Sequence, residues 1–440
     1  MLGQRCASAR CTIAYATSFD HVWFATREEI AQGIWNVTTP HRVMNIDAPA
    51  AKSQTADPVR RARQLRPLIE AEAPAGERAC ALTPKLLAAL HDARLFKMLL
   101  PRSVSGEEID PLTFITAIEE IARADGSTAW CIAQASGCSM AAAYLEPAVA
   151  QEIFGGKDAV LAWGPLGPTV KATAVEGGYR ATGTWSYASG SRHAQWLGGH
   201  SHLVDAEGKP CLGPDGKPTE RTMLFPKSQA TIRDVWQVMG LKGTGSDSYT
   251  LTDLFVPARY SFTRESAAER RESGPLYRFT TYQMYGSAFA SVALGIARAT
   301  LDAFIQIAGT KTPMLGSKPL RDNPVVQSKV AVAEAQWQSS RAFLMQALRD
   351  MWDTACRGED FTLQQRAALR LAAVHAGHQA KEVSETAYHF AGGTAIFENQ
   401  PFERRLRDVH AVTQQVQAQF VNFEVAGQVL LGLPVTSKLI

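Results

Sequence analysis

The 440-residue sequence lacks long apolar runs and has no strong excess of charge of either sign. No uninterrupted apolar run approaches the roughly 20 residues that a membrane-spanning helix needs. The 45 lysines and arginines stand against 42 aspartates and glutamates, which leaves a net charge of +3. So small an excess does not indicate a nucleic-acid partner. We therefore expect neither a membrane nor a nucleic acid among its partners.

Cysteine is scarce as well. The seven cysteines are scattered, with no CxxC pair and no metal-ligand spacing. His375 and His378 lie three residues apart in a helical stretch, but no carboxylate or cysteine stands beside them at ligand spacing, which favours surface or packing histidines. The sequence therefore predicts reduced thiols in a cytoplasmic protein and no metal site.

Two signatures of phosphate binding are absent. There is no Walker loop, and no GxGxxG follows a strand and opens a helix. The glycine-rich stretch 240–246 lies among expected strands, where glycines more often serve turns than phosphates. A Ser/His/Asp set cannot be assembled from local spacing either, because such partners are not sequence neighbours.

The expected elements fall into three parts after an N-terminal segment. Residues 1–55 have no sustained amphipathic period and no apolar core of the length that a secretory signal needs. We predict a disordered extension there, and Met44 is an alternative start of translation to Met1. Residues 56–155 are predicted to form a helical domain. Thr83-Pro84 and Asp110-Pro111 each read as an N-cap followed by proline at the first helical position.

Glycine, proline and β-branched residues become frequent after Asp158, and residues 156–262 are predicted to form a central β domain. Residues 169–173, 179–185 and 249–251 alternate in the manner of strands. Residues 208–218 carry the turn chemistry of a surface hairpin or loop.

Residues 275–440 are predicted to form a C-terminal bundle of long helices, so that the fold class is α+β and mostly α. The stretch 390–408 interrupts the helical pattern with Gly392-Gly393 and resumes it after Pro401. Paired glycines let backbone amides approach a ligand closely. The helix that follows is expected to be continuous, because apolar residues recur at steps of three and four: Val409, Val412, Val416, Phe420 and Phe423.

Several motifs in order, between about Asp57 and Leu433, resemble the acyl-CoA dehydrogenase superfamily. They are Asp125–Trp130, Gly178–Gly190, Met239–Ser246 followed by Leu254–Pro257, and Gly392–Asp408. The resemblance implies an N-terminal helical domain, a central β-barrel-like domain, a C-terminal four-helix bundle and a homotetramer. It also places Arg321 and Gln327 where the family contacts the cofactor of a neighbouring subunit.

The sequence departs from the dehydrogenases at their catalytic base. Aligning the C-terminal motif without gaps puts Asn399 where a glutamate usually stands, and an amide cannot accept the α-proton of an acyl thioester. Glu398 is the adjacent alternative base. The departures are similar to those of one subgroup, the two-component flavin-dependent monooxygenases. That likeness implies FMNH2 or FADH2 supplied by a separate flavin reductase, O2 as cosubstrate, and hydroxylation of an aromatic or heteroaromatic small molecule.

The same resemblance implies roles for particular residues. The Ser189 hydroxyl would hydrogen-bond flavin N5, the alternative being a turn-capping serine. Trp130 would wall the flavin or substrate pocket, the alternative being a core aromatic. Gly392, Gly393 and Thr394 would contact the flavin through backbone and hydroxyl groups.

Histidine follows the subgroup less closely. His410, just after Arg407-Asp408, is the candidate for proton management in catalysis, the alternative being a helix-surface histidine. Cys138 and Gln414 or Gln415 stand where the subgroup commonly has histidines. Two other functions remain open from the sequence: an acyl-CoA dehydrogenase-type enzyme with Glu398 as base, and a non-catalytic scaffold that kept the fold.

Overall fold

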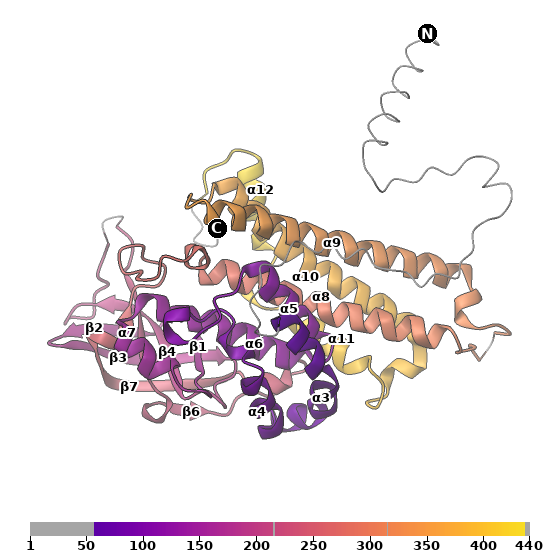
Figure 1. The fold of residues 1–440 in the computed structure, drawn as a ribbon, viewed down its shortest axis with the longest axis horizontal. Coiled ribbons are helices and arrows are strands. Elements are labelled where there is room, and N and C mark those ends of the chain that lie inside the picture. The colour runs from indigo at the N-terminus through magenta and orange to yellow at the C-terminus, as the bar shows by residue number, and fades with distance from the viewer. Residues whose placement is uncertain (1–56, 214–215, 315, 436–440) are drawn as a thin grey trace, which may run out of the picture. The chain divides into compact units, whose positions relative to one another are not determined.

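The computed structural model describes residues 57–213, 216–314 and 316–435 (Figure 1). The predicted N-terminal extension, with Met44, lies outside the described residues. Within them the chain forms helices, then strands, then long helices, which is the order that the sequence predicted. The boundaries drawn between the three predicted domains stay predictions.

The first part is built of helices whose starts the sequence marks well. Thr83 Oγ1 accepts a hydrogen bond from Leu86 N at 3.2 Å, and Asp110 accepts one from Thr113 N at 2.9 Å. Both predicted caps are therefore confirmed; they satisfy amides that the first helical turn leaves without a backbone partner. The helices are α3 (Pro58–Ala79), α4 (Pro84–Asp92), α5 (Pro111–Ala122), α6 (Gly126–Ser139) and α7 (Pro147–Phe154).

One sheet of eight strands follows. Its order is β6-β7-β3-β2-β4-β5-β8, and β1 pairs with β4. The strands are β1 (Leu161–Gly164), β2 (Lys171–Val175), β3 (Gly178–Ala188), β4 (Trp196–Val204), β5 (Glu220–Pro226), β6 (Thr231–Arg233), β7 (Asp247–Pro257) and β8 (Ser261–Phe262). The predicted strands 169–173, 179–185 and 249–251 fall on β2, β3 and β7.

The sheet is open, and the expected barrel-like closure does not occur among the described strands. A barrel needs its two edge strands to pair with each other. Here β6 pairs only with β7, and β8 pairs only with β5. Because these edges are three and two residues long, neither offers the length that closure needs.

Three long helices make up most of the last part, and Figure 1 shows them side by side. They are α8 (Thr281–Ala308), α9 (Pro324–Cys356) and α10 (Leu363–Ala391), followed by the shorter α11 (Glu403–Val412) and α12 (Val421–Leu430). Helix α8 is long and apolar enough to cross a membrane, but 83% of that apolar window is buried inside the protein. It is placed as a core helix.

The predicted continuous helix after Pro401 is wrong in its second half. Helix α11 ends at Val412, a short 3-10 turn (Val416–Ala418) follows, and α12 begins at Val421. The Thr413 hydroxyl donates to His410 O, and the Gln415 side chain accepts from Gln417 N, so polar side chains stabilise the break. Phe420, one of the residues in that apolar spacing, is 69% exposed.

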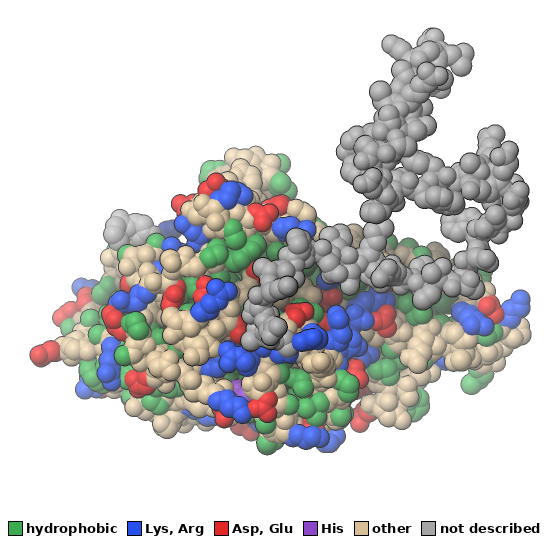
Figure 2. Space-filling view, in the orientation of Figure 1, with side chains coloured by type: hydrophobic (Ala, Val, Ile, Leu, Met, Phe, Trp, Pro, Cys, Tyr) green, Lys and Arg blue, Asp and Glu red, His purple; other side chains and the backbone are tan. Residues whose placement is uncertain are grey.

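Charged side chains of both signs lie interspersed on the face seen in Figure 2. Many form ion pairs between elements distant in sequence. Arg341 Nε lies 2.7 Å from Glu119, joining α9 to α5, and Arg298 Nη1 lies 2.6 Å from Glu334, joining α8 to α9. Side chains of opposite charge thus pair with each other between helices of the fold.

Candidate functional site

Ser189 lies in a sharp turn at the end of β3. The pairing of β3 with β7 shifts register between Trp185 and Ala188, as at a bulge. Tyr187 has φ of +59° and Gly190 has φ of +79°, so the chain reverses within a few residues. The turn buries the Ser189 side chain, which is only 6% exposed, against helix α6.

Trp130 meets Ser189 from α6. Its indole Nε1 donates to Ser189 Oγ at 2.9 Å. Asp125 caps the start of this helix by accepting from Thr128 N at 2.8 Å, which fixes where its second turn places the indole. The structure therefore brings together two residues that the sequence linked to one cofactor.

An aromatic stack from α8 supports Trp130. The Phe289 ring lies parallel to the indole, with centroids 3.8 Å apart and planes 6° apart. The Tyr285 ring is also parallel to Phe289, with centroids 5.5 Å apart and planes 2° apart. The sequence analysis missed this pair, although the four-residue spacing puts both rings on one face of a helix.

Two further hydroxyl groups adjoin Ser189. Ser189 Oγ lies 2.7 Å from Ser246 Oγ, and Ser246 Oγ lies 2.7 Å from Thr244 Oγ1. Thr244 Oγ1 donates to the Leu241 carbonyl at 2.8 Å. From the sequence, residues 240–246 were expected to form turns within a family motif, because nothing local shows that this loop packs against the end of β3.

Helix α11 holds that loop in place. Asp408 Oδ1 accepts from Leu241 N at 2.6 Å, and Arg407 Nη1 donates to Met239 O at 2.7 Å. Arg407 also pairs with Glu77 of α3 at 2.5 Å. The Arg-Asp pair of the C-terminal motif thus secures the segment that carries Thr244 and Ser246.

Asp408 is an unusual acid in this contact. It is 3% exposed, and burial raises its pKa to about 7, with the nearby Asp125 carboxylate adding to the rise and the Leu241 amide opposing it. The link between α11 and the Leu241 loop therefore changes charge near neutral pH.

Gly392, Gly393 and Thr394 form a second group at the end of α10. Lys311, just after α8, donates through Nζ to Ala391 O at 2.5 Å and to Thr394 Oγ1 at 2.6 Å. Gly392 has φ of +58°, and a Cβ added at Gly393 would meet no atom within 4 Å. Lys311 was not singled out from the sequence, since it lies 80 residues before its partners.

Arg321 and Gln327 lie close to this second group. Leu320 N donates to Lys311 O at 2.9 Å, and Gln327 Nε2 donates to Arg321 O at 2.9 Å. Both side chains are exposed. In Figure 1 this end of the three long helices points away from the sheet. Among the described residues, no hydrogen bond or ion pair joins the second group to Ser189 or Trp130.

His410 is also apart from Ser189. Its Nε2 lies 3.0 Å from Glu385 Oε1, on the half-exposed side of α11 that faces α10. Neither Ser189 nor Trp130 bonds to it within the described chain. A catalytic role for His410 stays a prediction.

Cys138 lies in a closed environment between α6 and α8. Its Sγ is 3.4 Å from Tyr285 Oη, and Gln134 Nε2 lies 3.7 Å away. Burial raises the pKa of the Cys138 thiol to about 12, so the thiol is neutral near pH 7. Gln414 is exposed, and the Gln415 side chain caps the 3-10 turn.

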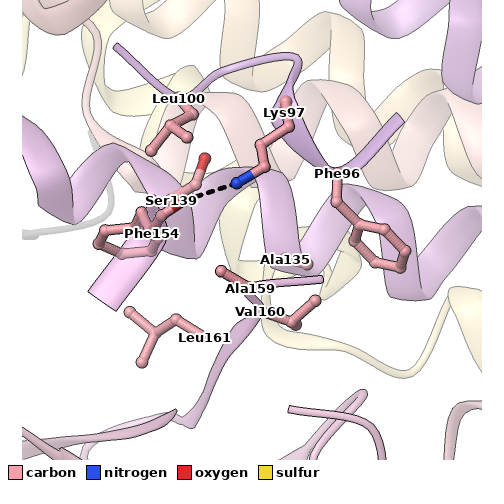
Figure 3. Close-up of a pocket in the computed structure, with 9 residues that line it drawn as sticks. All are labelled: Phe96, Lys97, Leu100, Ala135, Ser139, Phe154, Ala159, Val160 and Leu161. Atoms are coloured by element: carbon pink, nitrogen blue, oxygen red, sulfur yellow. Dashed lines mark hydrogen bonds between the residues drawn. The ribbon is translucent and has the colours of Figure 1, made fainter. Parts of the chain in front are cut away.

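A hollow lies on another face of α6 (Figure 3). Its lining residues are Phe96, Lys97, Leu100, Ala135, Ser139, Phe154, Ala159, Val160 and Leu161. It spans about 230 Å³, open solvent included. The Lys97 ammonium donates to Phe154 O at 2.5 Å and to Gly156 O at 2.8 Å, which caps the end of α7. Neither Ser189 nor Trp130 lines this hollow.

The two groups of residues fit different parts of a flavin. Tyr187 and Met239, which lie two residues before Ser189 and Leu241 in the chain, are 66% and 59% exposed. Apolar side chains beside a buried hydroxyl suit a flat ring whose edge carries hydrogen-bonding nitrogens. Lys311 and the glycine turn suit a phosphate, which binds ammonium groups and backbone amides.

Comparison with known proteins shows which proteins this chain is similar to. The family described as "Acyl-CoA dehydrogenase, C-terminal domain" matches residues 287–420. The chain is 31% identical over 338 residues to indole-3-acetate monooxygenase of Pseudomonas putida, which covers 77% of this chain and 84% of that protein. It is 25% identical to the flavin-dependent monooxygenase, oxygenase subunit HsaA, of Rhodococcus jostii, over 80% of this chain and 92% of that one.

A solved structure shares the fold. XiaF from Streptomyces sp., in complex with FADH2 and glycerol, superposes with a TM-score of 0.80 at 23% identity. The match covers 87% of this chain and 96% of that one. The two proteins therefore share their overall fold.

Proposed function

The chain belongs to the flavin-dependent monooxygenases that share the acyl-CoA dehydrogenase fold, and we propose that it is the oxygenase component of a two-component system. In such a system a separate reductase supplies FMNH2 or FADH2, and O2 is the cosubstrate. Reduced flavin activates O2 and delivers one oxygen atom to the substrate. The observation that carries the proposal is the buried contact between Trp130 and Ser189, supported by the Phe289 stack.

We propose an aromatic or heteroaromatic small molecule as substrate, with indoles the first class to test. The relative from Pseudomonas putida is named for an indole acid. The apolar surroundings of α6 and α8 suit such a ring, because Trp130, Phe289 and Tyr285 are less than a tenth exposed.

Ser189 and Trp130 would orient the flavin ring. Ser189 Oγ would accept a hydrogen bond from flavin N5, and the indole would fix the position of that oxygen. The stack behind Trp130 excludes water from this side of the ring. His410 stays the residue predicted to transfer protons in catalysis. To do so its side chain would have to move toward Ser189 from its position beside Glu385.

The second group would bind the phosphate end of a flavin. Lys311 and the backbone of Gly393 and Thr394 supply donors at the far end of α10 from the sheet. Because this end lies apart from Ser189, the flavin that it serves is proposed to sit mainly on a neighbouring subunit. The predicted homotetramer is consistent with apolar side chains exposed on α9, Val325 at 57% and Val332 at 52%.

Within the described residues, no feature favours the dehydrogenase alternative. Glu398 and Asn399 are both exposed in the turn before α11. A base for α-proton abstraction works best in a site from which water is excluded. Neither residue contacts the Trp130 and Ser189 pair within the described chain.

The test supplies purified full-length protein with chemically reduced FMN or FAD, indole or indole-3-acetate, and oxygen-18 gas. We expect one labelled oxygen atom in the product, measured by mass spectrometry. A reaction without protein, in which free reduced flavin only makes hydrogen peroxide, is the control. No labelled product with any indole or phenol would contradict the proposed function, whereas bleaching of oxidised FAD by an acyl-CoA would favour the dehydrogenase.

Lys311→Met is expected to weaken the binding of FMN about tenfold, because an ammonium–phosphate hydrogen bond is lost. Riboflavin has no phosphate, so its dissociation constant should stay unchanged. Both are measured by flavin fluorescence titration. Lys329→Met removes the same charge from an exposed position on α9 and serves as the matched control. Equal losses for FMN and riboflavin would mean that Lys311 only stabilises the glycine turn.

A further inference from the structure

A continuous chain of four hydrogen bonds runs through Ser189. It begins at Trp130 Nε1 and passes through Ser189 Oγ, Ser246 Oγ and Thr244 Oγ1, with separations of 2.9, 2.7 and 2.7 Å. It ends at the Leu241 carbonyl, 2.8 Å from Thr244 Oγ1. All three hydroxyl-bearing residues are less than a tenth exposed, so solvent offers few competing partners.

The two ends of the chain fix its direction. An indole N–H can only donate, and a carbonyl oxygen can only accept. The indole and the three hydroxyls supply one proton for each of the four bonds. All four form only if Thr244 donates to Leu241 O, Ser246 donates to Thr244, and Ser189 donates to Ser246.

The Leu241 carbonyl is well held as the accepting end. It also accepts from Trp236 Nε1 at 3.1 Å, and Leu241 N is bonded to Asp408. Gly190 N donates to Thr244 O at 2.9 Å, which ties the loop to the turn of Ser189. The backbone on both sides of the hydroxyls is therefore fixed, and the chain has little freedom to reverse.

Ser189 Oγ can consequently act toward a ligand only as a hydrogen-bond acceptor. Its proton is committed to Ser246, and one of its two lone pairs receives the Trp130 N–H. The remaining lone pair can only accept. A ligand atom that approaches Ser189 Oγ must therefore carry a hydrogen.

We propose that Thr244 and Ser246 are positioning residues that make the site selective for reduced over oxidised flavin. Flavin N5 carries a hydrogen in the reduced state and is a bare acceptor in the oxidised state. Ser189 Oγ, oriented by this chain, can accept a hydrogen bond from N5–H of reduced flavin. It has no proton to donate to N5 of oxidised flavin. The selectivity deepens the proposed function and rests on its contact between Ser189 and N5.

The consequence for the catalytic cycle is release of the spent cofactor. After oxygen transfer the flavin is oxidised, and its N5 and Ser189 Oγ are both hydrogen-bond acceptors. Oxidised flavin therefore binds less tightly than the incoming reduced flavin. An enzyme that receives its flavin from a separate reductase needs this order of affinities.

The test compares dissociation constants of reduced and oxidised FMN and FAD, titrated anaerobically against the full-length protein and its variants. Wild type should bind the reduced form more tightly. In Ser246→Ala the Ser189 proton loses its acceptor and can turn to oxidised N5. We expect tighter binding of the oxidised form, little change for the reduced form, and a ratio of the two constants reduced by about tenfold.

Thr244→Val should shift the ratio in the same direction, and Thr244→Ser, which keeps the hydroxyl, should restore it. Ser191→Ala is the matched control, because this buried neighbour donates to Gly245 O outside the chain. An unchanged ratio in Ser246→Ala, or parallel weakening of both forms, would overturn the proposal. Ser189→Ala with unchanged affinities for both forms would refute the N5 contact itself, and with it the proposed geometry.

Discussion

Gly240→Ala is expected to destabilise the protein by on the order of 3 kcal/mol and to abolish tight binding of reduced flavin. A Cβ at this position would lie 2.1 Å from the Arg407 carbonyl oxygen and 2.9 Å from Asp408 N. Both atoms belong to the backbone of α11, so neither can turn away as a side chain would. Loop 240–246 must separate from α11, and Thr244 and Ser246 move with it.

The measurement pairs chemical denaturation with anaerobic flavin titration. Gly377→Ala is the control, because a Cβ there meets no atom within 4 Å and the residue lies inside α10. Alanine is the better helix former, so this variant should be equally stable or more stable by about 0.5–1 kcal/mol. Wild-type stability and flavin affinity in Gly240→Ala would show that the contact between α11 and the loop is not needed.

Asp408→Asn is expected to flatten the dependence of stability on pH. The folded protein holds the Asp408 proton with a pKa of about 7, because burial disfavours the carboxylate. An aspartate in the unfolded chain titrates near 3.9. Between these values the folded state binds more protons, so the free energy of unfolding falls as pH rises. Above both values the loss is complete.

From pH 5 to pH 8 the contribution of this carboxyl group falls by on the order of 3 kcal/mol. Asparagine keeps an oxygen for the Leu241 amide but does not titrate, so the variant should lack this slope. Unfolding in urea at several pH values measures it. Glu176→Gln, which alters an exposed carboxylate in the turn before β3, should follow the wild-type profile. Parallel profiles for wild type and Asp408→Asn would contradict the assignment.

The two predictions concern the same contact from its two sides. Gly240 allows the loop to approach α11, and Asp408 binds the loop once it is there. The Leu241 carbonyl is also the last acceptor of the hydroxyl chain. A substitution of Gly240 or Asp408 should therefore alter the hydrogen bonding of Ser189, although neither residue contacts the ligand. This gives the Arg-Asp pair of the C-terminal motif a role in positioning the loop.

Local patterns in the sequence were enough for much of the fold. The caps at Thr83 and Asp110 depend on residues three positions apart, and the helix break at Gly392-Gly393 depends on adjacent residues. Features that depend on such near neighbours can be predicted from the sequence. The order of motifs was enough to identify the superfamily, and the departures from the dehydrogenases were enough to identify the monooxygenase subgroup. Asn399 showed by its chemistry that the usual position of the dehydrogenase base holds an amide, although Glu398 stayed open as an alternative base.

Other features depend on contacts between distant segments, which local spacing does not encode. The sheet stays open because its edge strands are short, and the apolar spacing after Val412 did not show that polar side chains would break the helix. Trp130, Ser189 and Thr244 come from three separate segments, and only their packing turns three hydrogen-bonding groups into a directed chain. The sequence by itself determined the class of chemistry, and the tertiary structure decided which atoms of Ser189 remain available to a flavin.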